Sequence, residues 1–174
     1  MKINKLMYGF VQQDNVDHRN VVVLKSTVYQ AMQHKLTFYM KVLGSHNRVF
    51  NVEISFDSVK EIKGISSREE AEEYLNDGRH ALVKDGGGSN HIVEKPLARR
   101  NPVEVRCDCE SFRFTYAYAN RRHNALFPPD FPPYKRKTPV RGGRPRRNPI
   151  KLPGRCKHLV VASEFLIENE HIVD

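Results

Sequence analysis

The sequence lacks tryptophan, contains only three cysteines among its 174 residues, and has no long apolar run. Three cysteines argue against a disulfide framework, because such frameworks use cysteines in even numbers. No stretch reaches the apolar length of a membrane span, and the first residues lack the apolar core of a signal peptide. We therefore expect a soluble protein, made in the cytosol, that folds as one domain or as one domain with a sizeable extension.

Acidic residues are scarce in one segment of the chain. Residues 99–157 contain sixteen Lys and Arg but only four acids, a balance of +12 in a chain whose net charge is +9. The remaining residues are slightly acidic, with a balance of −3. Such a basic segment is typical of a surface that binds nucleic acid or an acidic protein, although a solvated basic loop has the same composition.

Two stretches of alternating apolar and polar residues flank a short turn. Apolar side chains occupy every second position from Leu36 to Val42, and again from Phe50 to Phe56. Between them, the sequence GSHN at residues 44–47 provides a glycine and an asparagine for a turn. Because side chains alternate between the two faces of a strand, the pattern predicts a β-hairpin with one buried face.

Shorter elements are predicted beyond the hairpin. Residues 67–76 have the pattern of a helix, with Ser67 as its N-cap, acids in its first turn and Gly78 as its stop signal. The stretches 91–97 and 102–109 are short strand candidates. These elements and the hairpin predict an α+β fold, in which a small sheet is accompanied by a few short helices.

The two ends of the chain differ in how clearly they indicate structure. Residues 1–34 are compatible with either a strand or a helix. Residues 110–127 and residues 156–170 are helix candidates, each with apolar side chains on one face. These apolar positions are Phe112, Tyr116 and Ala119 in the first candidate, and Leu159, Ala162, Phe165 and Leu166 in the second.

A proline-rich basic loop connects the two helix candidates. Residues 126–155 contain eight prolines, three glycines and a dense run of basic residues. Proline fixes φ and lacks a backbone N–H, which excludes a regular helix or an inner strand. We therefore expect an extended loop here, and we divide the chain into an α+β part with the hairpin, residues 1–98, and a part with the basic loop, residues 99–174.

All three cysteines lie in two tight doublets. Cys107 and Cys109 end a strand-like stretch, and Cys156 and His158 begin the final helix candidate. Three thiolates and one imidazole form a typical ligand set of a closed, structural zinc site. The sequence therefore predicts that these four residues bind Zn²⁺ and clamp the second part of the chain, with His123 as the alternative fourth ligand. The competing interpretation is three small buried residues and an unrelated surface histidine.

The pattern Cys107-x-Cys109 followed by Cys156-x-His158 resembles the Cys-x-Cys…Cys-x-His pattern of SWIM-type zinc fingers. The surrounding stretches VEVRCDCESFRFTYAYANRRHNALF, PPYKRKTPVR and NPIKLPGRCKHL look most like the SWIM-like proteins encoded by tailed bacteriophages. The resemblance covers roughly residues 100–168. It implies zinc binding by the same four residues and implies nothing catalytic. The 46 residues between the doublets form a longer span than that of a minimal finger.

The sequence does not indicate an enzyme. A catalytic zinc keeps one open coordination position and has a carboxylate base nearby. Asp108 and Glu110 lie beside the cysteines, but four ligands are already present, and we interpret these acids as polar neighbours. The sequence also lacks the motifs of zinc deaminases, serine hydrolases and metalloproteases.

The resemblance and the basic loop together predict a structural role. Zinc would hold both ends of the loop, and the prolines would direct it outward as a basic arm. We expect a non-enzymatic component of a phage particle, located in the capsid, the head–tail junction or the tail, where it contacts other particle proteins after synthesis in the host cytoplasm. The arm residues expected to contact the partner are Lys135, Arg136, Lys137, Arg141, Arg144, Arg146 and Arg147.

A second hypothesis is a cytoplasmic accessory protein that binds nucleic acid. The basic segment is interleaved with aromatic side chains that could stack on bases. These aromatic residues are Phe112, Phe114, Tyr116, Tyr118 and Tyr134. Packing in the core explains most of them equally well.

Overall fold

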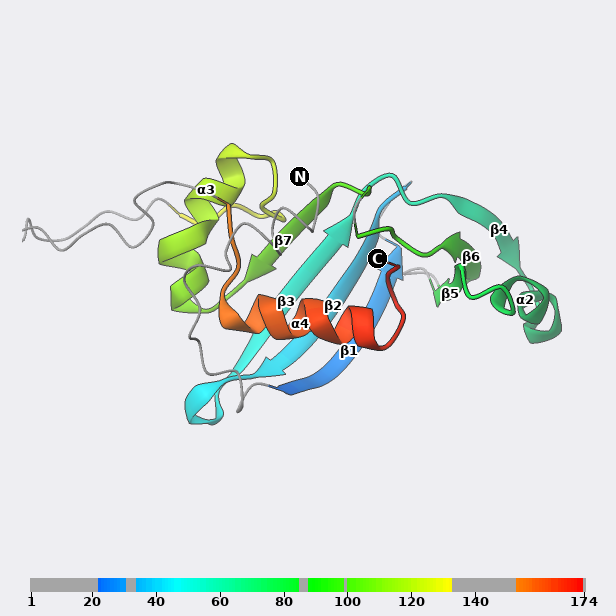
Figure 1. Cartoon of the computed structure of the whole chain (residues 1–174), viewed down its shortest axis with the longest axis horizontal. Coiled ribbons are helices and arrows are strands. Elements are labelled where there is room, and N and C mark those ends of the chain that lie inside the picture. The colour runs from blue at the N-terminus through cyan, green and yellow to red at the C-terminus, as the bar shows by residue number, and fades with distance from the viewer. Residues whose placement is uncertain (1–21, 31–33, 85–87, 99, 133–152, 174) are drawn as a thin grey trace, which may run out of the picture.

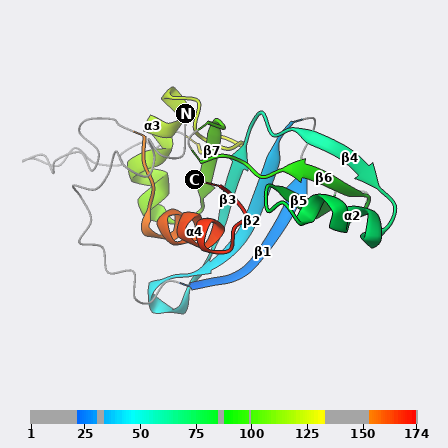
Figure 2. The same ribbon diagram turned by 45° about the vertical axis from the view of Figure 1, so that its right-hand side comes forward.

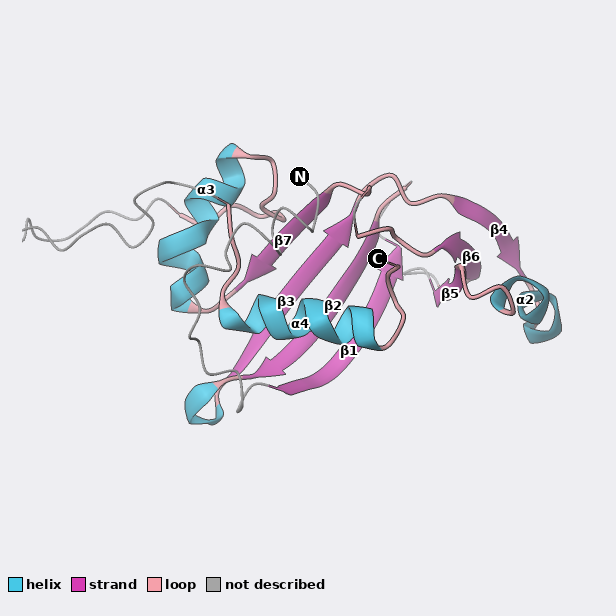
Figure 3. Ribbon diagram, viewed as in Figure 1, coloured by secondary structure: helices cyan, strands magenta, loops and turns pink. Residues whose placement is uncertain are grey.

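The computed structural model describes residues 22–30, 34–84, 88–98, 100–132 and 153–173. These residues form two antiparallel sheets and a few short helices, which confirms the α+β prediction (Figure 1 and Figure 3). The larger sheet has the strand order β1 (Val22–Gln30), β2 (Leu36–Leu43), β3 (Val49–Phe56) and β7 (Val103–Cys107). The smaller sheet has the order β4 (Glu61–Ile65), β6 (Asn90–Glu94) and β5 (His80–Lys84).

The predicted hairpin is confirmed and lies at the centre of the larger sheet. β2 and β3 pair from Leu36 opposite Phe56 to Leu43 opposite Val49. The turn between them contains the short 3-10 segment η1 (Ser45–Asn47). One face of the hairpin is buried, as the alternation of apolar residues indicates. Its buried apolar side chains are Leu36, Phe38, Met40, Val42, Val52, Ile54 and Phe56.

Helix α4 (Lys157–Glu168) lies across this buried face (Figure 1). Leu159, Ala162 and Leu166 point into the core formed with the sheet, and none of them is exposed to solvent. Burial of a leucine side chain contributes roughly 1.5–3 kcal/mol. The predicted C-terminal helix is thus confirmed, and its apolar face attaches the end of the chain to strands from the first half.

The smaller sheet is accompanied by helix α2 (Arg68–Leu75), as Figure 2 shows. The helix starts where it was predicted to start, because the Ser67 hydroxyl accepts a hydrogen bond from the Glu70 backbone N–H at 3.2 Å. The chain leaves the helix through Gly78, whose φ of +69° favours glycine. Ala71 of the helix and Ile92 of β6 are fully buried.

The two predicted parts of the chain share one sheet. β7 comes after residue 98, yet it pairs with β3, placing Val105 opposite Ile54. Near the other end, Ala98 N–H donates to the Val173 carbonyl at 2.7 Å, and Val173 N–H donates to the Pro96 carbonyl at 2.9 Å. Residues on both sides of residue 98 therefore build the same core.

A helical segment follows β7. It consists of the π-helical turn η2 (Phe112–Tyr116) and helix α3 (Ala117–Arg122), and it buries the face that was predicted. The chain then returns beside β7, where Val105 N–H donates to the Ala125 carbonyl at 2.9 Å. Residues 133–152, which include all seven predicted contact residues of the arm, lie outside the described residues.

Candidate metal centre

Four side chains from two distant segments meet at one end of the larger sheet. Cys107 is the last residue of β7, and Cys109 follows two residues later. Cys156 and His158 lie on either side of the first residue of α4. The four potential ligand atoms lie within 4.8 Å of one another, and all four residues are buried. These residues, here called the Cys₃His cluster, are the four that the sequence predicts as metal ligands.

The distances within the cluster suit a single metal ion. The His158 Nδ1 atom lies 3.8 Å from the Cys107 sulfur and 4.0 Å from the Cys156 sulfur. In a tetrahedral site with metal–sulfur bonds of about 2.3 Å and metal–nitrogen bonds of about 2.0 Å, sulfur and nitrogen are about 3.5 Å apart. The observed separations exceed this value by only a few tenths of an ångström, so the cluster could hold a metal ion.

The three thiols influence one another strongly because they are buried together. Hydrogen bonds from the thiols of Cys107 and Cys156 lower the pKa of Cys109. Hydrogen bonding to Cys109 and Cys156 raises the pKa of Cys107, and burial raises the pKa of Cys156. The cluster alone therefore favours one thiolate hydrogen-bonded by two thiols. A divalent cation would stabilise all three as thiolates, which is the form that binds metals.

The imidazole of His158 is held by the turn between β2 and β3. The ring of Phe50, in β3 directly after the turn, stacks on it with a centroid distance of 4.3 Å and an interplanar angle of 29°. In the turn itself, a Cβ atom at Gly44 would lie only 2.4 Å from the His158 Nε2 atom. Only glycine therefore allows the turn to approach this closely, a role that the sequence pattern did not reveal because Gly44 also fits an ordinary hairpin turn.

Asp108, between the first two cysteines, faces the sheet. Its carboxylate accepts hydrogen bonds from the Asn51 backbone N–H at 3.1 Å and from the Asn51 side-chain amide at 2.8 Å. Asp108 N–H in turn donates to the Asn51 carbonyl at 3.2 Å. Asp108 thus extends the pairing of β7 with β3 beyond Cys107 and fixes the backbone from which Cys109 projects.

A buried asparagine holds the second doublet in place. The side chain of Asn120 in α3 donates to the Gly154 carbonyl at 2.9 Å and accepts from the Gly154 N–H at 2.7 Å. Asn120 is fully buried, so loss of this pair of hydrogen bonds would leave polar groups unsatisfied. The residues leading into Cys156 are therefore fixed to the helix that follows Cys109. Sequence analysis missed this contact, because an asparagine in a helix is more often exposed.

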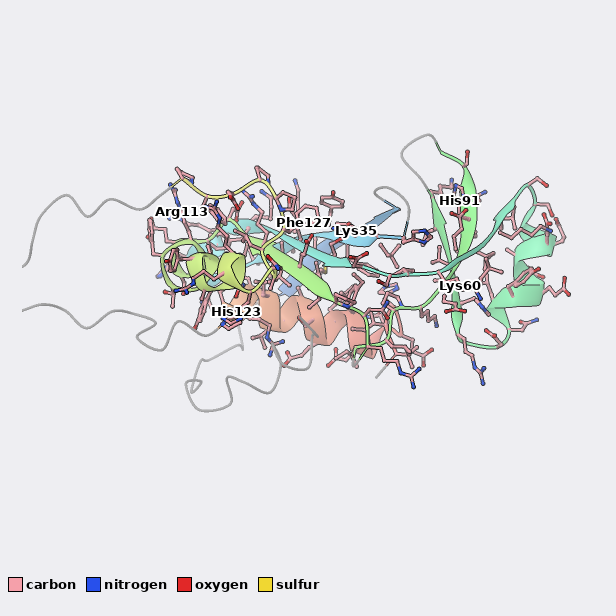
Figure 4. The ribbon with its side chains drawn as sticks, turned by 90° about the horizontal axis from the view of Figure 1, so that it is seen from above. Lys35, Lys60, His91, Arg113, His123 and Phe127 are labelled. Atoms are coloured by element: carbon pink, nitrogen blue, oxygen red, sulfur yellow. The ribbon has the colours of Figure 1, made fainter. Side chains whose placement is uncertain are left out.

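The other predicted residues lie apart from the cluster. His123, the alternative ligand, is exposed at the end of α3 (Figure 4). It does not belong to the cluster. Phe112 and Tyr116 are buried, whereas Phe114 and Tyr118 are 38% and 63% exposed. Tyr134 lies outside the described residues. Core packing therefore accounts for two of the four described aromatic residues.

No protein-family model matches the chain, and no curated protein or solved structure matches it significantly. Among the helices that the structure describes, none has both the length and the apolar character needed to cross a membrane. The functional interpretation therefore rests on the chemistry of the cluster and its surroundings.

Proposed function

We propose that the Cys₃His cluster binds Zn²⁺ as a structural ion and that the protein is a non-enzymatic interaction protein. Three thiolates and one imidazole suit zinc, because soft sulfur ligands select against magnesium and calcium and a tetrahedral set suits a d¹⁰ ion. The observation that carries the proposal is the convergence of four buried ligand atoms from segments about 50 residues apart. Four protein ligands leave no open position for a substrate, which favours structure over catalysis.

The zinc would set the geometry of the basic arm. Cys109 and Cys156 bracket the 46 residues that contain residues 126–155. Closing a segment of this length costs roughly 3–4 kcal/mol of chain entropy. A bound zinc and the Asn120–Gly154 hydrogen bonds would offset that cost in the folded protein. The arm would then leave and return at neighbouring points of one surface, as a docking element requires.

We further propose that the arm docks onto other subunits of a bacteriophage particle. The support is the resemblance of the two doublets and their flanking stretches to SWIM-like phage proteins, together with the basic composition of the arm. On this proposal the protein is made in the host cytoplasm and resides in the virion.

The particle role has a direct test in purified particles of the phage that, on this proposal, encodes the chain. Quantitative mass spectrometry should find the protein at a fixed copy number per particle. A variant with all seven arm cations from Lys135 to Arg147 changed to glutamine should keep its fold and zinc but lose incorporation. Absence of the unmodified protein from purified particles contradicts the proposal, as does normal incorporation of the variant.

One observation favours nucleic acid as an alternative partner. Phe114 and Tyr118 are exposed four residues apart, and the Arg113 guanidinium lies 5.4 Å from the centre of the Phe114 ring. Exposed aromatic rings beside cations can stack on unpaired bases. If this surface binds single-stranded nucleic acid, the affinity should fall steeply with salt concentration, and Tyr118→Ala should weaken it by about 1–3 kcal/mol. Unchanged binding in Tyr118→Ala argues against this surface.

A further inference from the structure

A cavity of about 610 Å³ lies beside the Cys₃His cluster. Three segments surround it: the turn between β2 and β3, the start of the helical segment after β7, and the start of α4. All three lie at the same end of the larger sheet (Figure 1). The volume is in the range of sites that bind small molecules or single groups of larger ones.

The wall of the cavity is positively charged. Among the described residues that line it, Arg48, Arg155 and Lys157 are cations, and Glu110 is a carboxylate. A zinc ion with three thiolates and a neutral imidazole adds one further negative charge. The wall keeps a positive balance even with that charge included, and it would attract an anion.

Hydrogen-bond donors also gather at the cavity. Lys157 and His158, which line it, are the first two residues of the twelve-residue helix α4, and no acid occupies the first turn of that helix. The positive end of the helix dipole of α4 therefore lies at the wall of the cavity. Ser111 adds a hydroxyl group to the wall.

The buried imidazole of His158 has one ring nitrogen that faces away from the sulfur atoms. Its side chain is buried, and within the described residues its Nε2 atom has no hydrogen-bond partner. The Nδ1 atom faces the sulfurs, so a metal-bound His158 carries its remaining proton on Nε2. A metal-ligating histidine almost always donates this proton to an acceptor, often a carboxylate or a water molecule. The Nε2 atom lies against Gly44 of the turn, which does not line the cavity, so an anion there would be held by the cations of the wall and by the start of α4.

We propose that this cavity binds a phosphate group beside the zinc centre. A phosphate presents three oxygens in a tetrahedral arrangement, which matches donors that converge from three segments, whereas a carboxylate presents two oxygens in one plane. The ligand is a free phosphate or the terminal phosphate of a nucleotide or nucleic acid. This binding activity goes beyond the structural role proposed above, because a structural zinc needs no ligand at its side.

Arg48 is the residue best suited to test the cavity. It is exposed on the turn, so Arg48→Gln removes a charge from the wall without removing core packing. Arg113→Gln is the matched control, because Arg113 is likewise an exposed arginine (Figure 4) but does not line the cavity. Zinc content and thermal unfolding of both variants are measured first, so that a failure of the zinc proposal is seen separately.

The experiment titrates the zinc-loaded full chain with inorganic phosphate and follows binding by calorimetry. We expect saturable binding that Arg48→Gln weakens about tenfold and Arg113→Gln leaves unchanged, since a charge-assisted contact is lost only in the first. No saturable binding by zinc-loaded protein overturns the proposal. Equal weakening by the two variants also overturns it, because a general charge effect would then explain the result.

A second arm distinguishes the sources of the phosphate. A short oligothymidylate is compared with and without a 5′-phosphate. Tighter binding of the phosphorylated strand, lost in Arg48→Gln, supports a nucleic-acid end as the ligand. Binding of inorganic phosphate but of neither strand supports a small free phosphate. Equal binding of both strands, sensitive only to Arg113→Gln, overturns the cavity site and favours the exposed surface of Phe114 and Tyr118.

Discussion

The two sheets of this protein are assembled in opposite ways. The smaller sheet and its helix α2 come from one continuous stretch, residues 61–94. The larger sheet combines the hairpin with β7, which is about 50 residues away from it in sequence, and is covered by α4 from the end of the chain. The Cys₃His cluster belongs to the larger sheet and its covering helix, where the end of β7 meets the start of α4.

Local interactions dominate the smaller region. Ser67 caps α2, Lys63 forms an ion pair with Glu70, and His91 Nδ1 lies 2.7 Å from a carboxylate oxygen of Glu61. Exposed pairs of this kind contribute little individually, because solvent screens them. The region therefore relies on short-range contacts and a few buried residues, two of which, Val83 and Val93, belong to the same core as the larger sheet. The larger region must instead bring distant segments together, and this is where a metal ion can contribute most.

The largest expected effect is the loss of the metal by a ligand variant. His158→Gln should lower zinc affinity by more than about a hundredfold, because structural zinc sites contribute on the order of 10 kcal/mol from four ligands. Hydrogen–deuterium exchange should then show loss of protection in β7 and at the start of α4, while α2, β5 and β6 stay protected.

His123→Gln is the control for that variant, since His123 is an exposed histidine outside the cluster. It should keep both zinc and the exchange pattern of the unmodified protein. Uniform loss of protection in His158→Gln, extending through α2 and β6, contradicts the distinction between the two regions.

The second largest effect concerns pH. In the folded metal-free protein, the pKa values of Cys107 and Cys156 are raised and that of Cys109 is lowered. Two thiols are then protonated at neutral pH, and zinc must displace about two protons on binding. Apparent zinc affinity should therefore rise about 100-fold per pH unit until the thiols ionise, as measured by competition with a chromophoric chelator. A slope near zero shows that the thiols are already ionised.

A smaller effect is expected from the turn that approaches His158. Gly44→Ala places a Cβ atom 2.4 Å from His158 Nε2 and 2.8 Å from the Phe50 ring, so the imidazole must shift. Loss of such positioning typically lowers metal affinity about 10–100-fold. The matched control is Gly64→Ala in β4, where the nearest heavy atom is His91 Nδ1 at 3.9 Å. Equal zinc affinities in the two variants would show that the approach of the turn is unimportant.

The smallest effect belongs to the smaller region. Ser67→Ala removes the N-cap of α2 and should cost about 1 kcal/mol, seen as faster hydrogen exchange in α2 with unchanged zinc affinity. Ser67→Asp retains a capping oxygen and should keep most of the protection. A change of zinc affinity in Ser67→Ala would mean that the two regions are energetically coupled.

The parts of the fold that were predictable are those with local patterns. Alternation defined the hairpin of β2 and β3, and the capping serine and Gly78 defined α2. The sequence did not decide whether the β1 segment is a strand or a helix. Its pairing with β2, and not its own propensity, makes it a strand. The pairing of β7 with β3 was likewise not predictable, since no local pattern encodes a partner far away in the chain.

The candidate site was predictable to the level of its ligands. The spacing of the doublets identified all four members of the cluster, because few residue types bind soft metals. The contacts that position these four residues could not be predicted from the sequence. Asn120 forms hydrogen bonds with Gly154, and Asp108 forms hydrogen bonds with Asn51. Gly44 leaves space for the His158 imidazole. Each of these contacts joins segments that meet only in the folded protein.

The central claim is that one zinc ion joins β7 to α4. The most direct measurement is the metal content of the protein, purified without chelators or added metal, combined with X-ray absorption spectroscopy at the zinc edge. The account predicts one zinc per chain, bound by three sulfur atoms and one nitrogen atom at distances of about 2.3 Å and 2.0 Å. A folded protein without zinc, or a zinc shell that contains oxygen ligands, would contradict it.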